Sequence, residues 1–238
     1  MPEVTLYQYK ICPYCNRVKA LLDFLEIKYT AIEVNPLTKS ELSSFAYKKV
    51  PIAKINGDVV IESKPIFDCL VSFIDENEQK RKFFGQDTEK WAEWSDRRLA
   101  VYLYPNLTST LEASYESFSY TSEVKQWNVL WQVVTRCASS VAMWAASGRI
   151  KSKYNIKDEV KELDTEIQVW LDALGDKKFL QGDSVSMSDL LVFGVLKAVE
   201  GLSVQSRLFA RFPVLGRWYD DVEKTIRKGA RKPISSDM

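Results

Sequence analysis

Histidine is missing from this 238-residue chain. Its imidazole has an unperturbed pKa near neutral pH, so its absence excludes Ser-His-Asp triads, Cys-His dyads, histidine-ligated haem and H-E-x-x-H zinc sites. Cysteine is scarce as well, and four residues are too few for the disulfide framework of a secreted chain of this length. Catalysis here must therefore use thiols, carboxylates, hydroxyls or lysines.

Long apolar runs and an excess of one charge are also absent. The longest apolar stretches, such as residues 190–196, fall far short of the ~20 residues that span a bilayer. We therefore expect a soluble, cytoplasmic protein. The sequence leaves open a longer precursor with an organellar or membrane-anchoring N-terminal segment. Membrane association is expected only through such a segment. The 33 basic and 32 acidic residues argue against a nucleic-acid partner.

The first 78 residues alternate between strand and helix patterns. Alternating β-branched and aromatic residues predict strands, apolar residues at helical spacing predict helices, and Asn56-Gly57 predicts a hairpin turn. The order β-α-β-α-β-β-α implies a small mixed sheet with helices on its faces. The expected strands are 4–9, 29–34, 50–55 and 59–62, and the expected helices are about 13–26, 39–47 and 63–74.

A polar run separates this half from a second half in which only helical periodicity is found. We therefore predict an α/β domain over 1–78, a linker over 79–88, an all-α domain over 89–230 and a tail over 231–238. The expected helices of the second domain lie at roughly 89–103, 122–148, 157–174, 187–202 and 213–228.

Cys12 and Cys15 form a C-x-x-C motif directly after a predicted strand and at the start of a predicted helix. The unpaired N–H groups and positive dipole of a helix N-terminus favour a thiolate and can lower its pKa from ~8.5 into the 3.5–7.5 range. Lys10 and Arg17 are expected to add positive charge. Cys15, one turn further on, can form or resolve a disulfide with Cys12. The pair therefore indicates redox or nucleophilic chemistry.

Two alternatives for the cysteines are less favoured. A zinc site would need two more ligands, and the chain offers only isolated cysteines and no histidine, so we predict no metal site. An inert structural pair is the other alternative. We expect Cys69 and Cys137 to be buried and to behave as small apolar side chains.

The strand order and Cys12-Pro13-Tyr14-Cys15 resemble the glutaredoxin branch of the thioredoxin fold. That fold carries a cis-proline where Val50-Pro51 stands. The backbone of the residue before this proline pairs with the cysteinyl group of glutathione. Glu62-Ser63 stands where glutathione transferases hold the γ-glutamyl carboxylate, and Ser63 also suits an N-cap. The resemblance therefore implies glutathione as cofactor, with binding residues Lys10, Cys12, Pro13, Tyr14, Val50, Pro51, Glu62 and Ser63.

An all-α domain behind a thioredoxin-like domain resembles the cytosolic glutathione transferases. Residues 186–189 read Ser-Met-Ser-Asp, a capping-box pattern that matches the folding motif of that family. Longer segments resemble the membrane-associated prostaglandin E synthase type 2 family, with 151–156 especially similar to its plant and algal members. These segments are 6–15, 33–36, 47–52, 116–120, 151–156 and 192–196.

The resemblance implies a homodimer that isomerises a prostaglandin endoperoxide, prostaglandin H2, to prostaglandin E2. Mammalian members can hold haem through a glutathione thiolate, but Tyr154 replaces their histidine near the site, which weakens a haem assignment. The cluster Arg149, Lys151 and Lys153 could attract a fatty-acid carboxylate, although a solvated helix end is the favoured interpretation.

Three functions remain open at this point. In the first, Cys12 or a glutathione thiolate opens the O–O bond of a small hydrophobic or peroxide-type substrate, and Tyr14 donates a hydrogen bond to the developing anion. In the second, Cys12 attacks a glutathione mixed disulfide and Cys15 resolves the intermediate. The catalytic candidates for these two functions are Cys12, Cys15 and Tyr14. The third is a non-catalytic, glutathione-dependent haem or iron–sulfur protein.

Overall fold

The computed structural model describes residues 2–74, 83–85 and 87–227. Its first domain contains a four-stranded sheet in the order β2-β1-β3-β4, in which β1 is parallel to β2 and antiparallel to β3. The mixed sheet predicted from the sequence is therefore confirmed. The elements are β1 (Val4–Gln8), α1 (Pro13–Phe24), β2 (Tyr29–Glu33), a 3-10 turn (Ser40–Leu42), β3 (Ile52–Ile55), β4 (Asp58–Ile61) and α2 (Ser63–Val71).

Successive side chains of β1 contact two different hydrophobic cores, one on each face of the sheet. Val4 and Leu6 are buried in the large core that also contains the inner faces of α1 and α2. Tyr7 points to the opposite face, where its ring meets that of Phe45 at 5.0 Å in a smaller cluster. Because successive strand residues point to opposite faces, one short strand supports both layers.

The second domain is all helical, as predicted. No helix within the described residues has the length and apolar character needed to cross a membrane. The elements are α4 (Thr88–Trp94), a π-helical turn (Ser95–Leu99), α5 (Ala100–Thr108), α6 (Leu111–Ser117), a 3-10 segment (Ser119–Glu123), α7 (Val129–Lys153), α8 (Glu159–Leu174), α9 (Met187–Lys197), α10 (Ser203–Arg211) and α11 (Pro213–Arg227).

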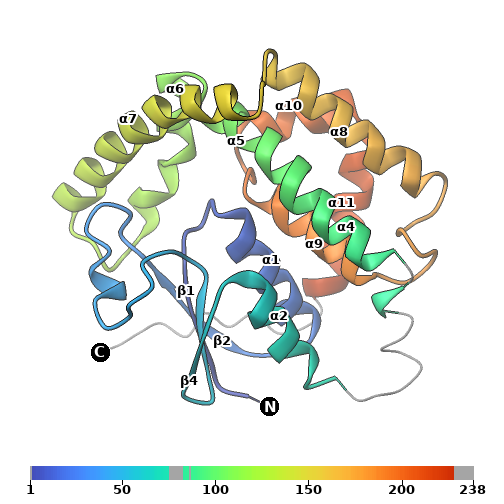
Figure 1. Cartoon of the computed structure of the whole chain (residues 1–238), viewed down its shortest axis with the longest axis horizontal. Coiled ribbons are helices and arrows are strands. Elements are labelled where there is room, and N and C mark those ends of the chain that lie inside the picture. Colours follow the sequence, from blue (N-terminus) through green and yellow to red (C-terminus); the bar gives the residue numbers. More distant parts are fainter. Residues whose placement is uncertain (1, 75–82, 86, 228–238) are drawn as a thin grey trace.

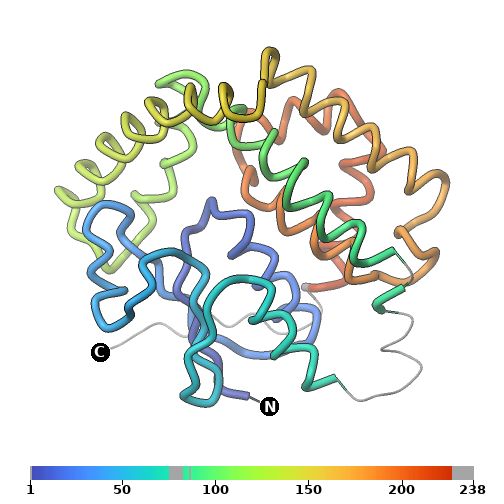
Figure 2. The backbone as a smooth tube through the Cα atoms, in the orientation of Figure 1, coloured from blue at the N-terminus to red at the C-terminus, as the bar shows by residue number. Residues whose placement is uncertain are grey.

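Helix α1 lies between the sheet and the helical domain, and its main partner there is α9 (Figure 1). The tube in Figure 2 shows these two segments side by side although they are far apart in the sequence. A Cβ atom on Gly194 of α9 would lie only 2.5 Å from the Cα of Arg17. The absence of a side chain at Gly194 therefore permits the close approach that docks the two domains.

Several predicted boundaries were wrong. The helix expected over 39–47 is only the turn Ser40–Leu42, and the helix expected from 122 begins at Val129, where the Asn128 side chain caps it. The N-cap of α2 is Glu62, so Ser63 is the first helical residue and not the cap. Helices α6 and α10 were not predicted from the sequence.

Two predicted segments lie wholly or partly outside the described residues. The tail 231–238 is entirely outside them, and so is half of the linker 79–88. Within the described part of that linker, Phe83 is buried and its ring stacks on Phe24 of α1 at 4.8 Å. This part of the linker thus packs on the first domain.

Candidate active site

The two thiols of the C-x-x-C motif occupy different environments. Cys12 is the N-cap of α1 and is partly exposed, whereas Cys15 is fully buried, and both are free. The Cys15 thiol hydrogen-bonds to Cys12, and this bond and backbone N–H groups at the helix start lower the pKa of Cys12. Burial raises the pKa of Cys15 well above its usual value. Cys12 is therefore the thiol that ionises first, and Cys15 holds its proton more strongly.

The cation near the thiols is not one of those expected from the sequence. The Lys10 ammonium forms an ion pair with Glu123 at 2.6 Å, and Arg17 is directed toward the helical domain. Lys19 supplies the positive charge that helps to lower the pKa of Cys12. It stands four residues after Cys15 on α1, so the two share one face of the helix.

Arg17 instead joins the two domains. Its buried guanidinium donates to the Ser95 hydroxyl at 2.7 Å and to the Leu191 carbonyl at 3.2 Å, and it forms an ion pair with Asp96. It also lies 5.4 Å from the ring centre of Tyr14. The Arg17 charge is thus compensated at the interface between the domains, next to the Tyr14 ring.

Glu33, at the end of β2, is a further titratable group, and it contacts the segment that leads from β1 to Cys12. Its carboxylate accepts a hydrogen bond from the Lys10 backbone N–H at 2.8 Å and another from the Gln8 amide at 3.0 Å. Burial nevertheless raises the pKa of Glu33 to about 7. This carboxyl can therefore exchange a proton near neutral pH.

An apolar cavity of about 490 Å³ lies between the domains and reaches Cys12. The wall from the first domain includes Cys12, Pro13 and Tyr14, and that from the second domain includes Met143 of α7. Among the described residues that line it there is no carboxylate, lysine or arginine. The cavity therefore suits an apolar molecule that meets the Cys12 side chain at one end.

Three tyrosines stand around this end of the cavity and remain protonated at neutral pH. Burial raises the pKa of Tyr9 to about 12, and burial and Asp96 raise the pKa of Tyr14. Burial also raises the pKa of Tyr120 well above its usual value. Each hydroxyl is thus a hydrogen-bond donor, as the sequence led us to expect of Tyr14 alone.

The residues expected to bind glutathione stand at the start of α1, just before β3 and at the start of α2. The Val50–Pro51 bond is cis, as the resemblance implies. Among the described residues, no backbone hydrogen bond engages the N–H or carbonyl of Val50, so both can pair with a peptide-like ligand. Glu62 has φ 69° and accepts a hydrogen bond from the Tyr47 hydroxyl at 3.3 Å, and Ser63 opens the N-terminus of α2.

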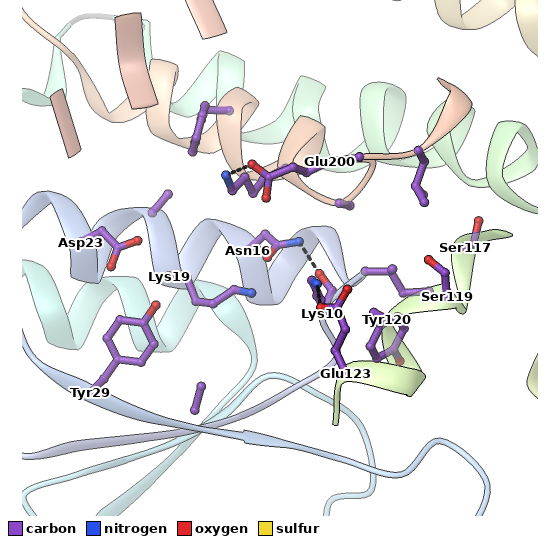
Figure 3. A pocket seen from close by; sticks show the side chains of 18 of the residues that line it. Lys10, Asn16, Lys19, Asp23, Tyr29, Ser117, Ser119, Tyr120, Glu123 and Glu200 are labelled. Atoms are coloured by element: carbon purple, nitrogen blue, oxygen red, sulfur yellow. Dashed lines mark hydrogen bonds and ion pairs between the residues drawn. The ribbon is translucent and has the colours of Figure 1, made fainter. Parts of the chain in front are cut away.

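A second cavity of about 550 Å³, lined by both polar and apolar residues, lies on the other face of α1 (Figure 3). Lys19 and Asn16 enter it from α1, and Tyr120 enters it from the segment Ser119–Glu123. Ile11, Ser117 and Tyr120 line both cavities, so these residues form the wall between them.

Sequence reasoning missed Tyr9, Lys19, Glu33 and Tyr120 as members of the site. Lys19 was recognisable in principle from its i, i+4 spacing to Cys15, but no local pattern marks Tyr120. The expectation that Cys137 is buried was wrong, because it is exposed on α7. The described residues contain no cluster of three or more His, Cys, Asp or Glu side chains able to hold a metal ion.

Known proteins resemble the chain over both domains. It is 29% identical to prostaglandin E synthase 2 of Danio rerio over 93% of this chain and 71% of that protein, and 28% identical to the Mus musculus protein over 95% and 71%. Poplar glutathione transferase F1 has the same fold, with a TM-score of 0.55 and 18% identity over 96% of this chain and 99% of that one.

Family models agree with this similarity. The glutathione S-transferase N-terminal domain matches residues 6–77, and the glutathione S-transferase C-terminal domain matches residues 130–225. Together, the two models cover both the sheet domain with the thiol pair and most of the helical domain. The chain belongs to the glutathione S-transferase superfamily, whose co-substrate is glutathione.

Proposed function

We propose that the protein is a prostaglandin E synthase type 2-like isomerase that converts an apolar endoperoxide, such as prostaglandin H2, into the corresponding hydroxy ketone. The observation that carries this proposal is the apolar cavity that ends at the Cys12 thiolate. The names of the Danio rerio and Mus musculus relatives support it.

In the proposed reaction, a thiolate of Cys12 or of glutathione attacks one peroxide oxygen, so that an S–O bond forms as the O–O bond breaks. The second oxygen takes a proton and becomes the hydroxyl. Loss of a proton from the carbon that bears the S–O oxygen forms the ketone and returns the thiolate, so the product is an isomer. The protonated Tyr14 hydroxyl donates to the developing oxygen anion, a contribution that can be worth about 3 kcal/mol.

Endoperoxide turnover with and without glutathione tests this proposal. We expect Cys12→Ser to lose at least about tenfold in kcat. Cys15→Ser should retain turnover, because Cys15 is buried and is not the nucleophile. Unchanged turnover in Cys12→Ser would remove that thiol from the mechanism. If glutathione were then needed for turnover, its thiolate would be the nucleophile.

The cavity itself can be tested with two matched alanine substitutions. Ala142 of α7 lines the apolar cavity, whereas Ala210 of α10 is exposed and lines neither cavity. We expect Ala142→Phe to raise KM for the endoperoxide by about tenfold because the ring fills the substrate space. Ala210→Phe is the matched control and should leave KM unchanged.

A second function is favoured by the hydrogen bond between Cys15 and Cys12. It is the reduction of glutathione mixed disulfides, in which the Cys12 thiolate attacks and Cys15 closes an intramolecular disulfide. Absence of mixed-disulfide turnover in the wild-type protein would exclude this function. If turnover occurs, Cys15→Ser will show whether the second thiol is needed.

For glutathione, we propose that Val50 pairs through its backbone with the cysteinyl part and that the N-terminus of α2 receives the γ-glutamyl carboxylate. Lys10, Pro13, Glu62 and the other residues implied by the resemblance complete this assignment. Calorimetric titration of Ser63→Ala should show weaker glutathione binding by about tenfold or less, because the backbone N–H groups remain. Wild-type affinity would remove the Ser63 hydroxyl from the site.

No contact among the described residues favours the haem or iron–sulfur function. The chain has no histidine to serve as an axial ligand, so haem would need another ligand, such as a thiolate. The proposed reactions use neither haem nor an iron–sulfur cluster.

We also propose that the homodimer forms through the outer face of α7. Leu130, Val134, Val141 and Trp144 are exposed, and their spacing places them on the face opposite the cavity. In sedimentation equilibrium, we expect a dimeric wild type and a monomeric Val134→Glu/Val141→Glu variant. A variant that remains dimeric would exclude this face.

A further inference from the structure

The second cavity, on the other face of α1 from the apolar cavity, takes no part in either proposed reaction. Its described lining contains four lysines and three carboxylates, so the lysines are in excess by one positive charge. An excess of positive charge favours an anionic ligand. The lysines are Lys10, Lys19, Lys28 and Lys197, and the carboxylates are Asp23, Glu123 and Glu200.

Most of these charges already have partners within the protein. Lys10 forms an ion pair with Glu123 at 2.6 Å (Figure 3). Lys197 forms ion pairs with Glu200 and, at 2.7 Å, with Glu223. Two of the four lysines and two of the three carboxylates are therefore paired.

Lys19 differs from these two lysines. Among the described residues, its ammonium has no ion pair within 4.0 Å and no hydrogen bond. The side chain is only partly exposed and extends from α1 into the cavity (Figure 3). The remaining lysine, Lys28, is exposed to solvent, and Asp23 has an interaction of its own.

The missing partner of Lys19 has an energetic consequence. Burial lowers the pKa of Lys19, because a charge that leaves water without a full partner is unfavourable. An anion in the cavity would supply that partner and would be attracted by the ammonium. Because Lys19 is the one partly buried cation of the described lining without a partner, a group with a single negative charge, such as a carboxylate, matches it.

Apolar side chains line the same cavity and set the character of the rest of the ligand. Ala20 and Ile27 come from the first domain, and Phe193 and Leu202 come from the second. The volume of about 550 Å³ lies within the range of about 300–1,000 Å³ that small-molecule sites occupy. The cavity therefore suits a small molecule with an apolar body and one anionic group.

We propose that the second cavity is a separate ligand site, which binds an organic carboxylate with an apolar body and holds its carboxylate by an ion pair with Lys19. Ile11, Ser117 and Tyr120 stand between this site and the apolar cavity, since they line both. The inference rests on neither proposed reaction, so the loss of either would leave it unaffected.

Calorimetric titration with phenylbutyrate and with its neutral analogue phenylbutanol tests the ion pair. We expect the wild type to bind the carboxylate at least about tenfold more tightly than the alcohol, because hydrogen bonds to charged groups commonly contribute that much. Lys19→Gln should lose this preference. Lys161→Gln, at an exposed lysine that lines neither cavity, is the matched control and should keep it. Equal binding of both ligands by the wild type would overturn the inference.

Two alanine substitutions locate the bound carboxylate without removal of a charge. Ala31 lies exposed on β2 and lines the second cavity, so the ring of Ala31→Phe should fill part of the site and weaken the binding of phenylbutyrate. Ala142→Phe fills the apolar cavity instead and should leave the affinity unchanged. The opposite pattern would place the ligand in the apolar cavity and contradict the proposal.

Chemical labelling of the wild type keeps the test independent of how the variants fold. Acetic anhydride acetylates lysines, and mass spectrometry measures the rate at each one. Phenylbutyrate should slow the acetylation of Lys19 in proportion to the occupancy of the site, while Lys161 reacts at an unchanged rate. An unprotected Lys19 at saturating phenylbutyrate would exclude it as the partner of the carboxylate.

Discussion

At the scale of the residue, neighbouring groups make two chemically identical thiols different. The sequence places both cysteines at one helix start, and a helix terminus favours the thiolate for either of them. The structure separates them by burial: Cys12 is partly exposed and receives a hydrogen bond, and Cys15 is buried and donates it. The motif predicted thiol chemistry. Which of the two thiols has the lower pKa depends on how deeply each is buried in the fold.

Replacement of Cys15 tests the source of the low pKa of Cys12. Cys15→Ala removes the hydrogen bond that most lowers this pKa, so the midpoint of Cys12 alkylation by iodoacetamide should move to higher pH. The measurement requires the Cys69→Ser/Cys137→Ser background. Cys15→Ser keeps a donor and should shift the midpoint less. Equal midpoints in all three proteins would assign the pKa to the helix terminus alone.

At the scale of the element, helix starts determine which sequence predictions succeed. The capping box at Ser186 and Asp189 is present, and the buried Asp189 carboxylate also accepts from the Leu180 N–H at 3.0 Å and the Trp218 indole at 2.9 Å. The unpredicted α6 begins at a Thr110 cap, which is a weaker signal because threonine occurs widely outside caps. Strong local signals were thus predictive, and short helices were missed.

Asp189→Ala should destabilise the protein by about 3 kcal/mol, because several buried donors lose their acceptor at once. Urea unfolding monitored by circular dichroism measures the change. Asp158→Ala is the matched control. Among the described residues the carboxylate of this exposed cap of α8 accepts only from the Lys161 N–H, so its loss should cost only about 1 kcal/mol. Equal losses in both variants would contradict the argument.

At the scale of the whole molecule, docking of α1 against α9 creates the site. Arg17 bonds across the interface to Ser95 and Leu191, and Gly194 lets the two helix backbones approach. The apolar cavity is built from both domains, so its position beside Cys12 depends on this docking.

Gly194→Ala tests the docking, because the added Cβ would meet the backbone of Arg17, which cannot move aside as a flexible side chain could. We expect a loss of about 1–3 kcal/mol in the free energy of unfolding. At Gly148 of α7 a Cβ would meet nothing within 4 Å, so Gly148→Ala should instead stabilise by about 0.5–1 kcal/mol. A thermal melt that ranks the two variants the other way would refute the close-packing argument.

What the sequence determined by itself is local. Side-chain periodicity predicted the mixed sheet and the helical half, and the Cys12–Cys15 spacing at a helix start predicted thiol chemistry. The missing histidines left the thiols with helix N–H groups, lysine and carboxylate as activating groups. Which lysine acts on the thiols was decided only by the tertiary structure: Lys10 is paired with Glu123, whereas the charge of Lys19 acts on both Cys12 and Cys15. The reason is that burial and distance between segments set a pKa, and neither is written in local sequence.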